Sequence, residues 1–310
     1  MTQGIDVAAI VGPTAAGKSS IGIEVAGALD AEIVSVDSMQ VYRGMDIGTD
    51  KVAADMRAGV PHHLVDVFPA SHAVTVAEYQ RLARAAIADI ASRGRLPLLV
   101  GGSGLYFRAV VDGLDFPARS SEVRASLEGE ARRVGARALY ERLERVDPEA
   151  ALRIEPTNAR RIVRALEAIE VGGRPFSSGR VWERYESSYD LRVAGITRPR
   201  AELYERIARR VERMLDAGLV AEVERLSEEG LGVTARQAVG YRQVLADPGA
   251  PASRLGDAIA AATKRLARRQ ESWFRADPRV VWFDAGARDA RECVAAFLAG
   301  AVKAPARPGR

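Results

Sequence analysis

Short apolar runs alternate with longer amphipathic segments along most of the chain. Five of these runs have the length and composition of buried strands, at residues 7–12, 32–37, 96–101, 191–196 and 279–284. Segments with apolar residues at helical spacing separate most of the runs. Strands that alternate with helices predict an α/β fold, in which helices cover both faces of a parallel sheet.

Helix signals are clearest in three segments. Thr75 is followed three residues later by Glu78, which is the pattern of a capping box, and Gly94 stands where that helix should end. Two further amphipathic segments are long, from about Pro199 to Ser227 and from Arg254 to Arg275. Their apolar spacing predicts helices.

The alternation of strands and helices breaks between Gly113 and about Arg192. This part is rich in Arg and Glu at helical spacing and contains no convincing buried strand, so it predicts a mostly helical insertion. The expected organisation is a core formed by residues 1–113 and 192–303, an insertion at 114–191, and a loose polar tail at 304–310.

Composition sets loose limits on the class of protein. With 310 residues and 47% hydrophobic content, the chain can bury a substantial core and form one large domain or two ordinary ones. A net charge of +4 and a pI near 9.4 permit a polyanionic partner, but scattered arginines are equally typical of an ordinary solvated surface. Composition alone therefore leaves nucleic-acid binding open.

Cysteine and histidine usage limits the possible sites and compartments. Cys293 is the only cysteine, so an intrachain disulfide and a cysteine-built metal site are excluded. His62, His63 and His72 lack metal-ligand spacing and are predicted to be surface or turn residues. Because the N-terminus lacks a basic start and no run of about 18 apolar residues occurs, we expect a cytoplasmic protein without a signal peptide or a membrane span.

The first predicted strand is followed by the sequence GPTAAGKSS and then by a helix-like segment. This is the strand–GxxxxGK[ST]–helix pattern of a phosphate loop. In such a loop the backbone N–H groups face an anion, Lys18 neutralises phosphate charge, and the Ser19 hydroxyl can hold Mg²⁺. Phosphate binding is therefore predicted for Gly12, Pro13, Thr14, Ala15, Ala16, Gly17, Lys18, Ser19 and Ser20.

Polar residues also follow two other predicted strands. Asp37 ends the second strand, beside the phosphate loop, where parallel sheets bind their ligands. Its carboxylate could be a Mg²⁺ ligand, a general base for an acceptor substrate, or a helix cap or turn former. After the third strand, the glycines of residues 101–104 would allow close approach of a ligand, and Ser103 among them could cap a helix or bond a substrate.

Six segments occur in order over nearly the whole chain: GPTAAGKS, SVDSMQVYRGMDIGT, LLVGGSGLYF, RIVRALE, AVGYRQ and KRLARRQESWFR. Together they resemble the tRNA dimethylallyltransferases, also called tRNA isopentenyltransferases. The resemblance implies a P-loop NTPase-like core and transfer of a dimethylallyl group from dimethylallyl diphosphate to N6 of the adenosine 3′-adjacent to the anticodon. The phosphate loop would then bind a prenyl diphosphate and not ATP.

The resemblance also implies roles in the chemistry. N6 of adenine is a poor nucleophile because its lone pair is delocalised into the ring, so a base that takes its proton would lower the barrier. Asp37 is that base by resemblance. The loop amides, Lys18 and a Mg²⁺ near Ser19 would stabilise the leaving diphosphate. Ser103, where the family usually has threonine, would orient the adenine or the diphosphate.

Two basic helix faces are predicted. Arg206 and Arg210 are spaced i, i+4 and could reach the diphosphate, but a solvated face explains them equally well. The second face pairs basic residues with an aromatic one and comprises Lys264, Arg265, Arg268, Arg269 and Trp273. Such a face suits a nucleic-acid backbone and a splayed base. Without the resemblance, a core tryptophan beside solvated arginines would be the better interpretation.

RNA contacts are expected from several parts of the chain, because a base of the anticodon loop must leave its stack before it can react. Besides that second basic face, the residues expected to contact tRNA are Asp37, Ser38, Met39, Gln40, Ser103, Arg124, Arg160, Arg161, Ile162, Val163, Arg164, Gln237, Val239, Gly240, Tyr241 and Arg242. Gln40 would bond a base edge and Tyr241 would stack on a base. Arg160 stands where family members usually carry glutamine.

Three other functions share parts of this pattern. An adenylate isopentenyltransferase would use the same donor with a free nucleotide as acceptor, but the predicted insertion and basic C-terminal helix favour RNA. A small-molecule kinase would bind ATP and transfer a phosphoryl group. An RNA-binding GTPase-like regulator would need a base-selecting motif such as Asn-Lys-x-Asp, which the sequence lacks. We expect a monomer whose partners are tRNA and the prenyl donor.

Overall fold

The chain forms two compact units in the computed structural model, which describes residues 5–114, 116, 120–178 and 184–301. Unit 1 comprises residues 1–112 and 187–310, and unit 2 comprises residues 113–186. Each unit has a hydrophobic core of its own. The predicted tail at 304–310 lies outside the described residues.

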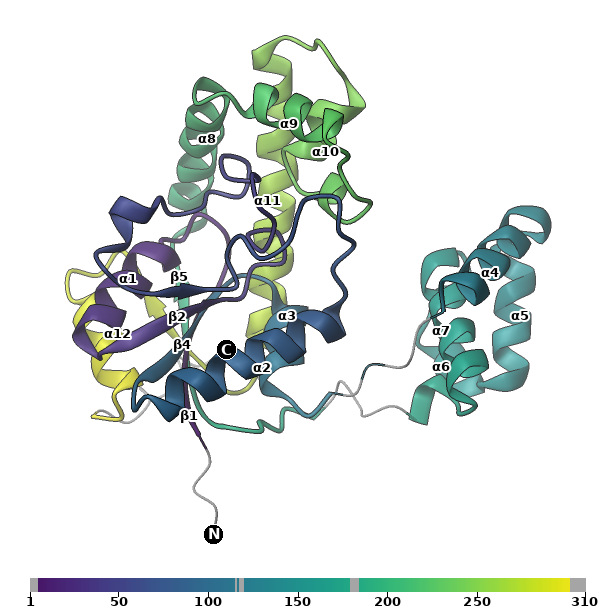
Figure 1. Ribbon diagram of the computed structural model, residues 1–310, viewed down its shortest axis with the longest axis horizontal. Coiled ribbons are helices and arrows are strands. Elements are labelled where there is room, and N and C mark those ends of the chain that lie inside the picture. The colour runs from purple at the N-terminus through teal and green to yellow at the C-terminus, as the bar shows by residue number, and fades with distance from the viewer. Residues whose placement is uncertain (1–4, 115, 117–119, 179–183, 302–310) are drawn as a thin grey trace. The chain divides into compact units, whose positions relative to one another are not determined.

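Unit 1 is built on a six-stranded sheet in which every pairing is parallel (Figure 1). In sheet order the strands are β3 (His62–His63), β2 (Ala31–Ser35), β4 (Leu96–Gly101), β1 (Asp6–Val11), β5 (Asp190–Thr197) and β6 (Val280–Asp284). Ala9 of the central strand lies opposite Leu99 and Val193. The strand is buried from Val7 onward because both of its faces are covered.

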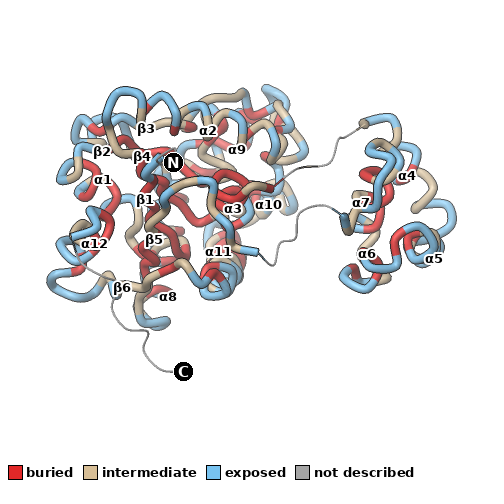
Figure 2. The backbone as a smooth tube through the Cα atoms, turned by 90° about the horizontal axis from the view of Figure 1, so that it is seen from below, coloured by how far each residue is buried: buried red, intermediate tan, exposed pale blue. Residues whose placement is uncertain are grey.

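Helices pack on both faces of this sheet, which confirms the predicted α/β fold. On one face lie α1 (Lys18–Ala28) and α12 (Ala290–Leu298), and on the other α2 (Val76–Ser92), α3 (Gly104–Val111) and α11 (Ala252–Ala276) (Figures 1 and 2). The remaining helices of unit 1 are α8 (Arg200–Asp216), which packs along α11, α9 (Leu219–Glu228) and α10 (Tyr241–Ala246). None of the helices that the structure describes is long and apolar enough to cross a membrane.

Helix ends follow local sequence signals. Thr75 Oγ1 accepts the N–H of Glu78 at 3.1 Å at the start of α2, so the predicted capping box is confirmed. The segment from Pro199 to Ser227 was predicted as one helix and is two. Gly218 has a φ of 96° between α8 and α9, and a residue in this left-handed conformation cannot continue a helix.

His62 and His63, which were predicted to be surface or turn residues, are half-buried and lie in a strand, so the turn alternative is wrong. The two residues form the short edge strand β3, in which His62 lies opposite Ile33. The Nε2 atom of His63 lies 2.6 Å from Oε2 of the buried Glu32. Hydrogen bonding from Arg93 lowers the pKa of Glu32 to about 2 and keeps this carboxylate charged. A strand of two residues is too short to produce an apolar pattern.

The described elements of unit 2 are helical: α4 (Ser121–Val134), α5 (Ala136–Val146), α6 (Pro148–Leu152), α7 (Ala159–Gly172) and the short 3-10 turn η2 (Phe176–Ser178). Leu139, Leu143 and Leu166 are central to its core. The insertion was predicted to end at residue 191, but unit 2 ends at residue 186. From Ser187 the chain belongs to unit 1, where Ser187 forms a β-bridge with Asp112. Ser188 N–H also donates to Val111 O at 2.8 Å.

Candidate active site

A cavity of about 370 Å³ lies at the carboxyl ends of the strands of unit 1. The phosphate loop, the end of β2, the glycine turn after β4 and helix α8 all contribute to its wall. The residues predicted from the sequence that line it are Thr14, Ala15, Gly17, Lys18, Ser19, Ser20, Asp37, Gln40, Arg206 and Arg210. The structure therefore brings the predicted anion site and the predicted base into one cavity.

The phosphate loop follows β1 and has the backbone that its glycines predict. Gly12 has a φ of 141°, and a Cβ at this position would overlap the carbonyl oxygen of Ile196. Ala15 and Gly17 have φ values of 65° and 102°. Gly12, Pro13 and Ala16 are buried, so they shape the loop from behind the cavity wall.

Lys18 is the cation at the centre of the loop. Its Nζ donates to the carbonyl oxygen of Pro13 at 2.7 Å. Burial lowers the pKa of Lys18 to about 8, although the negative charge of Asp37 opposes the shift; Arg210 lowers the pKa further. An anion bound in the loop would favour the charged ammonium and raise this pKa.

Helix α8 directs a row of arginines at the loop. Arg206 Nε donates to Ala15 O at 2.8 Å, and Arg210 donates to Thr14 Oγ1 at 2.9 Å. Arg209 and Arg213 also line the cavity. The two predicted arginines thus reach the loop, and binding of diphosphate by them stays a prediction.

Arg198 was not predicted, and it holds the same loop from the end of β5. Its Nε donates to Ala16 O at 3.0 Å, and its NH2 donates to Ala285 O at 3.1 Å. The residue follows a strand in a Pro-containing stretch with no motif of its own. Only its position after β5 could have indicated it, since ligand sites gather at the carboxyl ends of parallel strands.

Asp37 occupies the turn that follows β2. Its Oδ1 accepts the N–H of Met39 at 2.8 Å, and no hydrogen bond to Oδ2 occurs among the residues that the structure describes. The next N–H, that of Ser38, donates to Ser103 Oγ at 3.2 Å. Asp37 therefore has one oxygen that fixes its turn and one that can accept a proton from a ligand.

Ser103 supports this turn from the start of α3. It occupies the N-cap position, but its side chain makes no capping bond, so the capping alternative is wrong. Its hydroxyl is used instead by Ser38 and does not line the cavity. A direct role for Ser103 on adenine or diphosphate stays a prediction.

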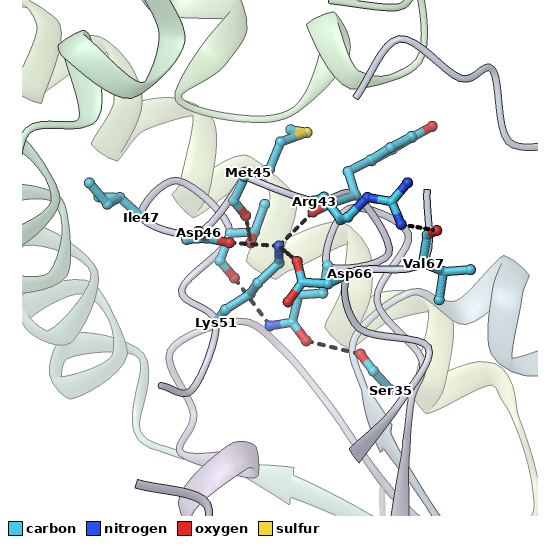
Figure 3. Close-up of polar contacts among 12 residues, drawn as sticks. Ser35, Arg43, Met45, Asp46, Ile47, Lys51, Asp66 and Val67 are labelled. Atoms are coloured by element: carbon cyan, nitrogen blue, oxygen red, sulfur yellow. Dashed lines mark hydrogen bonds and ion pairs between the residues drawn. The ribbon is translucent and has the colours of Figure 1, made fainter. Parts of the chain in front are cut away.

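A long loop after β2 closes one side of the cavity, and polar contacts hold it (Figure 3). Gln40 accepts from Ser35 Oγ at 2.9 Å and donates to Thr49 O at 3.2 Å. Figure 3 shows Lys51 between Asp46 and Asp66, at 2.7 and 2.5 Å. The amide of Gln40 is thus engaged at both ends, and its predicted bond to a base edge would require exchange of one of these contacts.

The same loop is held by Glu222 of α9, which sequence reasoning missed. Its carboxylate accepts the backbone N–H groups of Asp46, Ile47 and Gly48 at 2.9, 2.8 and 3.1 Å, and also the hydroxyl of Tyr241. A buried glutamate gives no sequence signal that distinguishes it from the surface glutamates around it.

The base-stacking role predicted for Tyr241 is wrong. The side chain is fully buried, and its hydroxyl bonds to Glu222. Burial and this hydrogen bond raise the pKa of Tyr241 far above its usual value. The ring lies so close to Gly48 that a Cβ there would overlap it. The neighbouring Gln237 and Arg242 are exposed, whereas Gly240 is buried and Val239 is half-buried against the core.

The glycine turn after β4 packs closely against other parts of unit 1. A Cβ at Gly101 would overlap the backbone of Val36, one at Gly102 would overlap Gln270, and one at Gly104 would overlap the Trp273 ring. Close protein packing thus requires these glycines, and because Gly101 and Gly102 also line the cavity, close approach of a ligand there stays a prediction. Gln270, also missed, lines the cavity as well.

Helix α11 carries its predicted basic face outward. Arg265, Arg268 and Arg269 are exposed, and Trp273 is 41% exposed. Lys264 is half-buried, with its Nζ 5.3 Å from the centroid of the Tyr204 ring. Helical spacing alone favoured a core position for Trp273, and that interpretation is wrong.

Unit 2 holds the remaining residues predicted to contact RNA. Arg160 and Arg161 are exposed at the start of α7, whereas Arg124 and Arg164 contact the buried Glu167 at 2.6 and 3.0 Å. The side-chain contacts to RNA predicted for Ile162 and Val163 are wrong, because both side chains lie in the core of unit 2. They occupy the inner face of an amphipathic helix whose outer face carries the arginines.

The cavity offers few protein side chains that could bind a metal ion. Among the described residues, no three His, Cys, Asp or Glu side chains gather as metal ligands. Ser19, Asp37 and Asp50 line the cavity. Mg²⁺ usually takes only one or two protein ligands and completes its shell with substrate phosphate oxygens and water. The residues present fit that mode of binding.

Comparisons with known proteins agree with this site. The family model described as IPP transferase matches residues 40–277. A tRNA dimethylallyltransferase of Streptomyces avermitilis is 53% identical over 291 residues, which are 92% of this chain and 92% of that one. The solved full-length tRNA isopentenylpyrophosphate transferase of Bacillus halodurans is 39% identical with a TM-score of 0.70, and the match covers 96% of both chains. The corresponding structure from Staphylococcus epidermidis is 32% identical with a TM-score of 0.67, over 95% of this chain and 97% of that one.

Proposed function

This chain belongs to the IPP transferase family, and we propose that it transfers a dimethylallyl group from dimethylallyl diphosphate to tRNA. The acceptor is N6 of the adenosine 3′-adjacent to the anticodon, and the products are N6-dimethylallyladenosine and diphosphate. The observation that carries the proposal is that Lys18 of the phosphate loop and Asp37 line the same cavity.

The donor diphosphate binds at the phosphate loop. Lys18, Arg206 and Arg210 supply positive charge there, and the first two also hold loop carbonyls. The Ser19 hydroxyl would hold a Mg²⁺ ion, which would supply further positive charge near the leaving group. Positive charge that is already in place at the loop favours cleavage of the carbon–oxygen bond, because negative charge grows on the diphosphate as that bond breaks.

The dimethylallyl group requires apolar surroundings close to the diphosphate. Ile33, Val52, Val65 and Val100 contribute apolar side chains to the cavity. A five-carbon chain in contact with them would be removed from water, and this burial favours binding. Mixed polar and apolar walls therefore support a prenyl diphosphate over a nucleoside triphosphate as the guest.

Asp37 acts as the general base. N6 attacks the allylic carbon, the carbon–oxygen bond breaks with its electron pair leaving on the diphosphate, and the N6 proton passes to the Asp37 carboxylate. The Oδ1 bond to Met39 N–H keeps the carboxylate oriented during this transfer. Its position at a strand end, within the same cavity as the phosphate loop, supports this assignment.

RNA reaches the site across the exposed basic face of α11, and the exposed Arg160 and Arg161 add contacts from unit 2. In this proposal the protein acts as a monomer. A tRNA substrate fits a cytoplasmic protein. Size-exclusion chromatography with light scattering checks the oligomeric state.

The test uses purified protein with dimethylallyl diphosphate, Mg²⁺ and an unmodified tRNA transcript. We expect dimethylallyladenosine in the digested RNA by mass spectrometry, together with an equal amount of released diphosphate. Replacing the tRNA with AMP tests a free-nucleotide acceptor, and replacing the donor with ATP tests phosphoryl transfer. The proposal is wrong if the intact, folded protein leaves the tRNA unmodified. Omitting Mg²⁺ with EDTA tests the metal separately.

A further inference from the structure

Gln270 links α11 to the phosphate loop. It is half-buried, it lines the cavity, and its Oε1 accepts the backbone N–H of Thr14 at 2.8 Å. Backbone N–H groups are the donors by which a phosphate loop holds an anion, so the orientation of each peptide in the loop bears on affinity. Gln270 thus fixes one end of the loop from a helix that is distant in sequence.

Thr14 is held at a second point by α8. Arg210 donates to the Thr14 hydroxyl at 2.9 Å and contacts Asp50 at 3.1 Å. The backbone of Thr14 is therefore bound to α11 and its side chain to α8. A ligand site positioned by regular elements is held more accurately than one on an unsupported loop.

The position of α11 is itself fixed by the glycine turn after β4. Side chains at Gly102 and Gly104 would overlap Gln270 and Trp273, which shows that the helix packs directly against the turn. The turn also carries Ser103, which accepts the N–H of Ser38 next to Asp37. One helix therefore supports both the anion site and the turn of the proposed base.

The outer face of α11 carries the exposed Arg265 and Arg269, which precede Gln270 by five residues and one. Because a helix moves as a rigid element, RNA bound to these arginines also restrains Gln270. The residues expected to contact RNA and the residue that bonds Thr14 thus lie on the same helix of unit 1.

We propose that Gln270 is a positioning residue that couples RNA binding on α11 to the affinity of the phosphate loop for the donor diphosphate. The inference rests on the proposed function for the identity of the two ligands. RNA that holds α11 in place tightens diphosphate binding, and by reciprocity diphosphate tightens RNA binding. Loss of one neutral hydrogen bond corresponds to a change in affinity of about two- to tenfold.

The test measures the dissociation constant of inorganic diphosphate with Mg²⁺ by calorimetry, with and without saturating unmodified tRNA. The variant is Gln270→Met, because methionine keeps the length of the side chain without a strong acceptor. We expect its diphosphate affinity without RNA to fall about two- to tenfold, and the effect of RNA on that affinity to vanish. Gln270→Glu keeps an acceptor oxygen and should keep the RNA effect. Ser253→Ala, an exposed change on the same helix, should match the wild type.

The inference is overturned if RNA does not change the diphosphate affinity of the wild type, or if Gln270→Met retains the wild-type RNA effect. A weaker affinity of Gln270→Met for RNA alone, without diphosphate, also overturns it, because that result indicates a direct RNA contact or general damage. These outcomes rest on binding alone. Wild-type protein that binds both ligands but does not modify tRNA would instead reject the proposed function.

Discussion

Lys18 and Asp37 have opposite charges in one cavity, and the balance between burial and attraction sets the protonation of the lysine. Burial lowers the pKa of Lys18 to about 8, because loss of water outweighs the favourable charge of Asp37. Lys18 is thus still protonated at neutral pH, but it loses its proton more easily than an exposed lysine does. Its affinity for an anion should depend on pH within an accessible range.

Diphosphate binding should weaken as the pH rises through about 8. The free protein loses the Lys18 proton there, whereas bound anion raises the pKa of Lys18, so binding above this pH requires proton uptake. The affinity falls by up to about tenfold for each pH unit above the free pKa. Calorimetry across this range measures the effect. Lys18→Met should bind weakly and lack this part of the pH dependence; an identical pH profile in both proteins would contradict the assignment.

Asp37→Asn should lower the single-turnover rate of tRNA modification by roughly 10²-fold or more, because an amide cannot accept the proton. Asparagine retains an oxygen for the Met39 N–H, so the stability of the fold should stay near that of the wild type. Asp55→Asn makes the same charge change at an exposed position and should leave the rate unchanged. Near-normal turnover of Asp37→Asn would mean that another group takes the proton.

The sequence predicted the roles of residues in local motifs better than it predicted the contacts that residues make with other parts of the fold. The phosphate loop and Asp37 were predicted because a local pattern fixes their place at strand ends. Tyr241 was placed incorrectly and Gln270 was missed, because their partners, Glu222 and Thr14, belong to other elements of the fold. An exposed and a buried tyrosine have the same local pattern when the helix is as short as α10.

Among the secondary-structure elements, the contact between α11 and the glycine turn can be tested with Gly104→Ala. The added Cβ would overlap the Trp273 ring, so α11 or the turn must shift. Overpacking of this kind costs about 1–3 kcal/mol of the free energy of unfolding. Urea denaturation measures that cost, and tRNA modification should slow as well.

Gly27→Ala is the matched control for Gly104→Ala. Gly27 lies within α1, and no atom lies within 4 Å of the position that its Cβ would take. Alanine in a helix interior should stabilise the protein by about 0.5–1 kcal/mol. If both variants were equally stable, close packing of α11 on the turn would not be the reason for glycine at 104.

The elements themselves were largely predictable. All five predicted strands occur, because strands buried on both faces are continuous apolar runs. The edge strand β3 was missed because its two residues pair with β2 only through tertiary structure. The break at Gly218 was missed because an amphipathic pattern continues through it. Contacts between elements, such as those of Glu222 with residues 46–48, had no sequence signal.

At the scale of the whole molecule, the two units should be separable. Asp112 and Ser187 are paired in a bridge, so the chain leaves and rejoins unit 1 at adjacent points. Each unit also has its own core. Replacing residues 113–186 with a short Gly–Ser linker should give a folded protein with diphosphate affinity within about twofold of the wild type.

The same deletion should greatly weaken tRNA binding, since it removes the exposed Arg160 and Arg161. Calorimetry with diphosphate and mobility shifts with tRNA measure the two effects on one preparation. The full-length Arg160→Ala/Arg161→Ala double variant separates loss of these charges from loss of the unit. A deletion variant that bound tRNA normally would show that unit 1 alone supplies the RNA surface.

The contacts of Glu222 have a consequence for any sequence variant that differs at this position. Its carboxylate is the shared acceptor for three N–H groups of the loop that carries Asp50 and Lys51 into the cavity. A replacement such as Glu222→Ala leaves those groups without their acceptor, and the loop would then lose its shape. A variant with this change should lose tRNA modification although all residues proposed to bind substrate are intact.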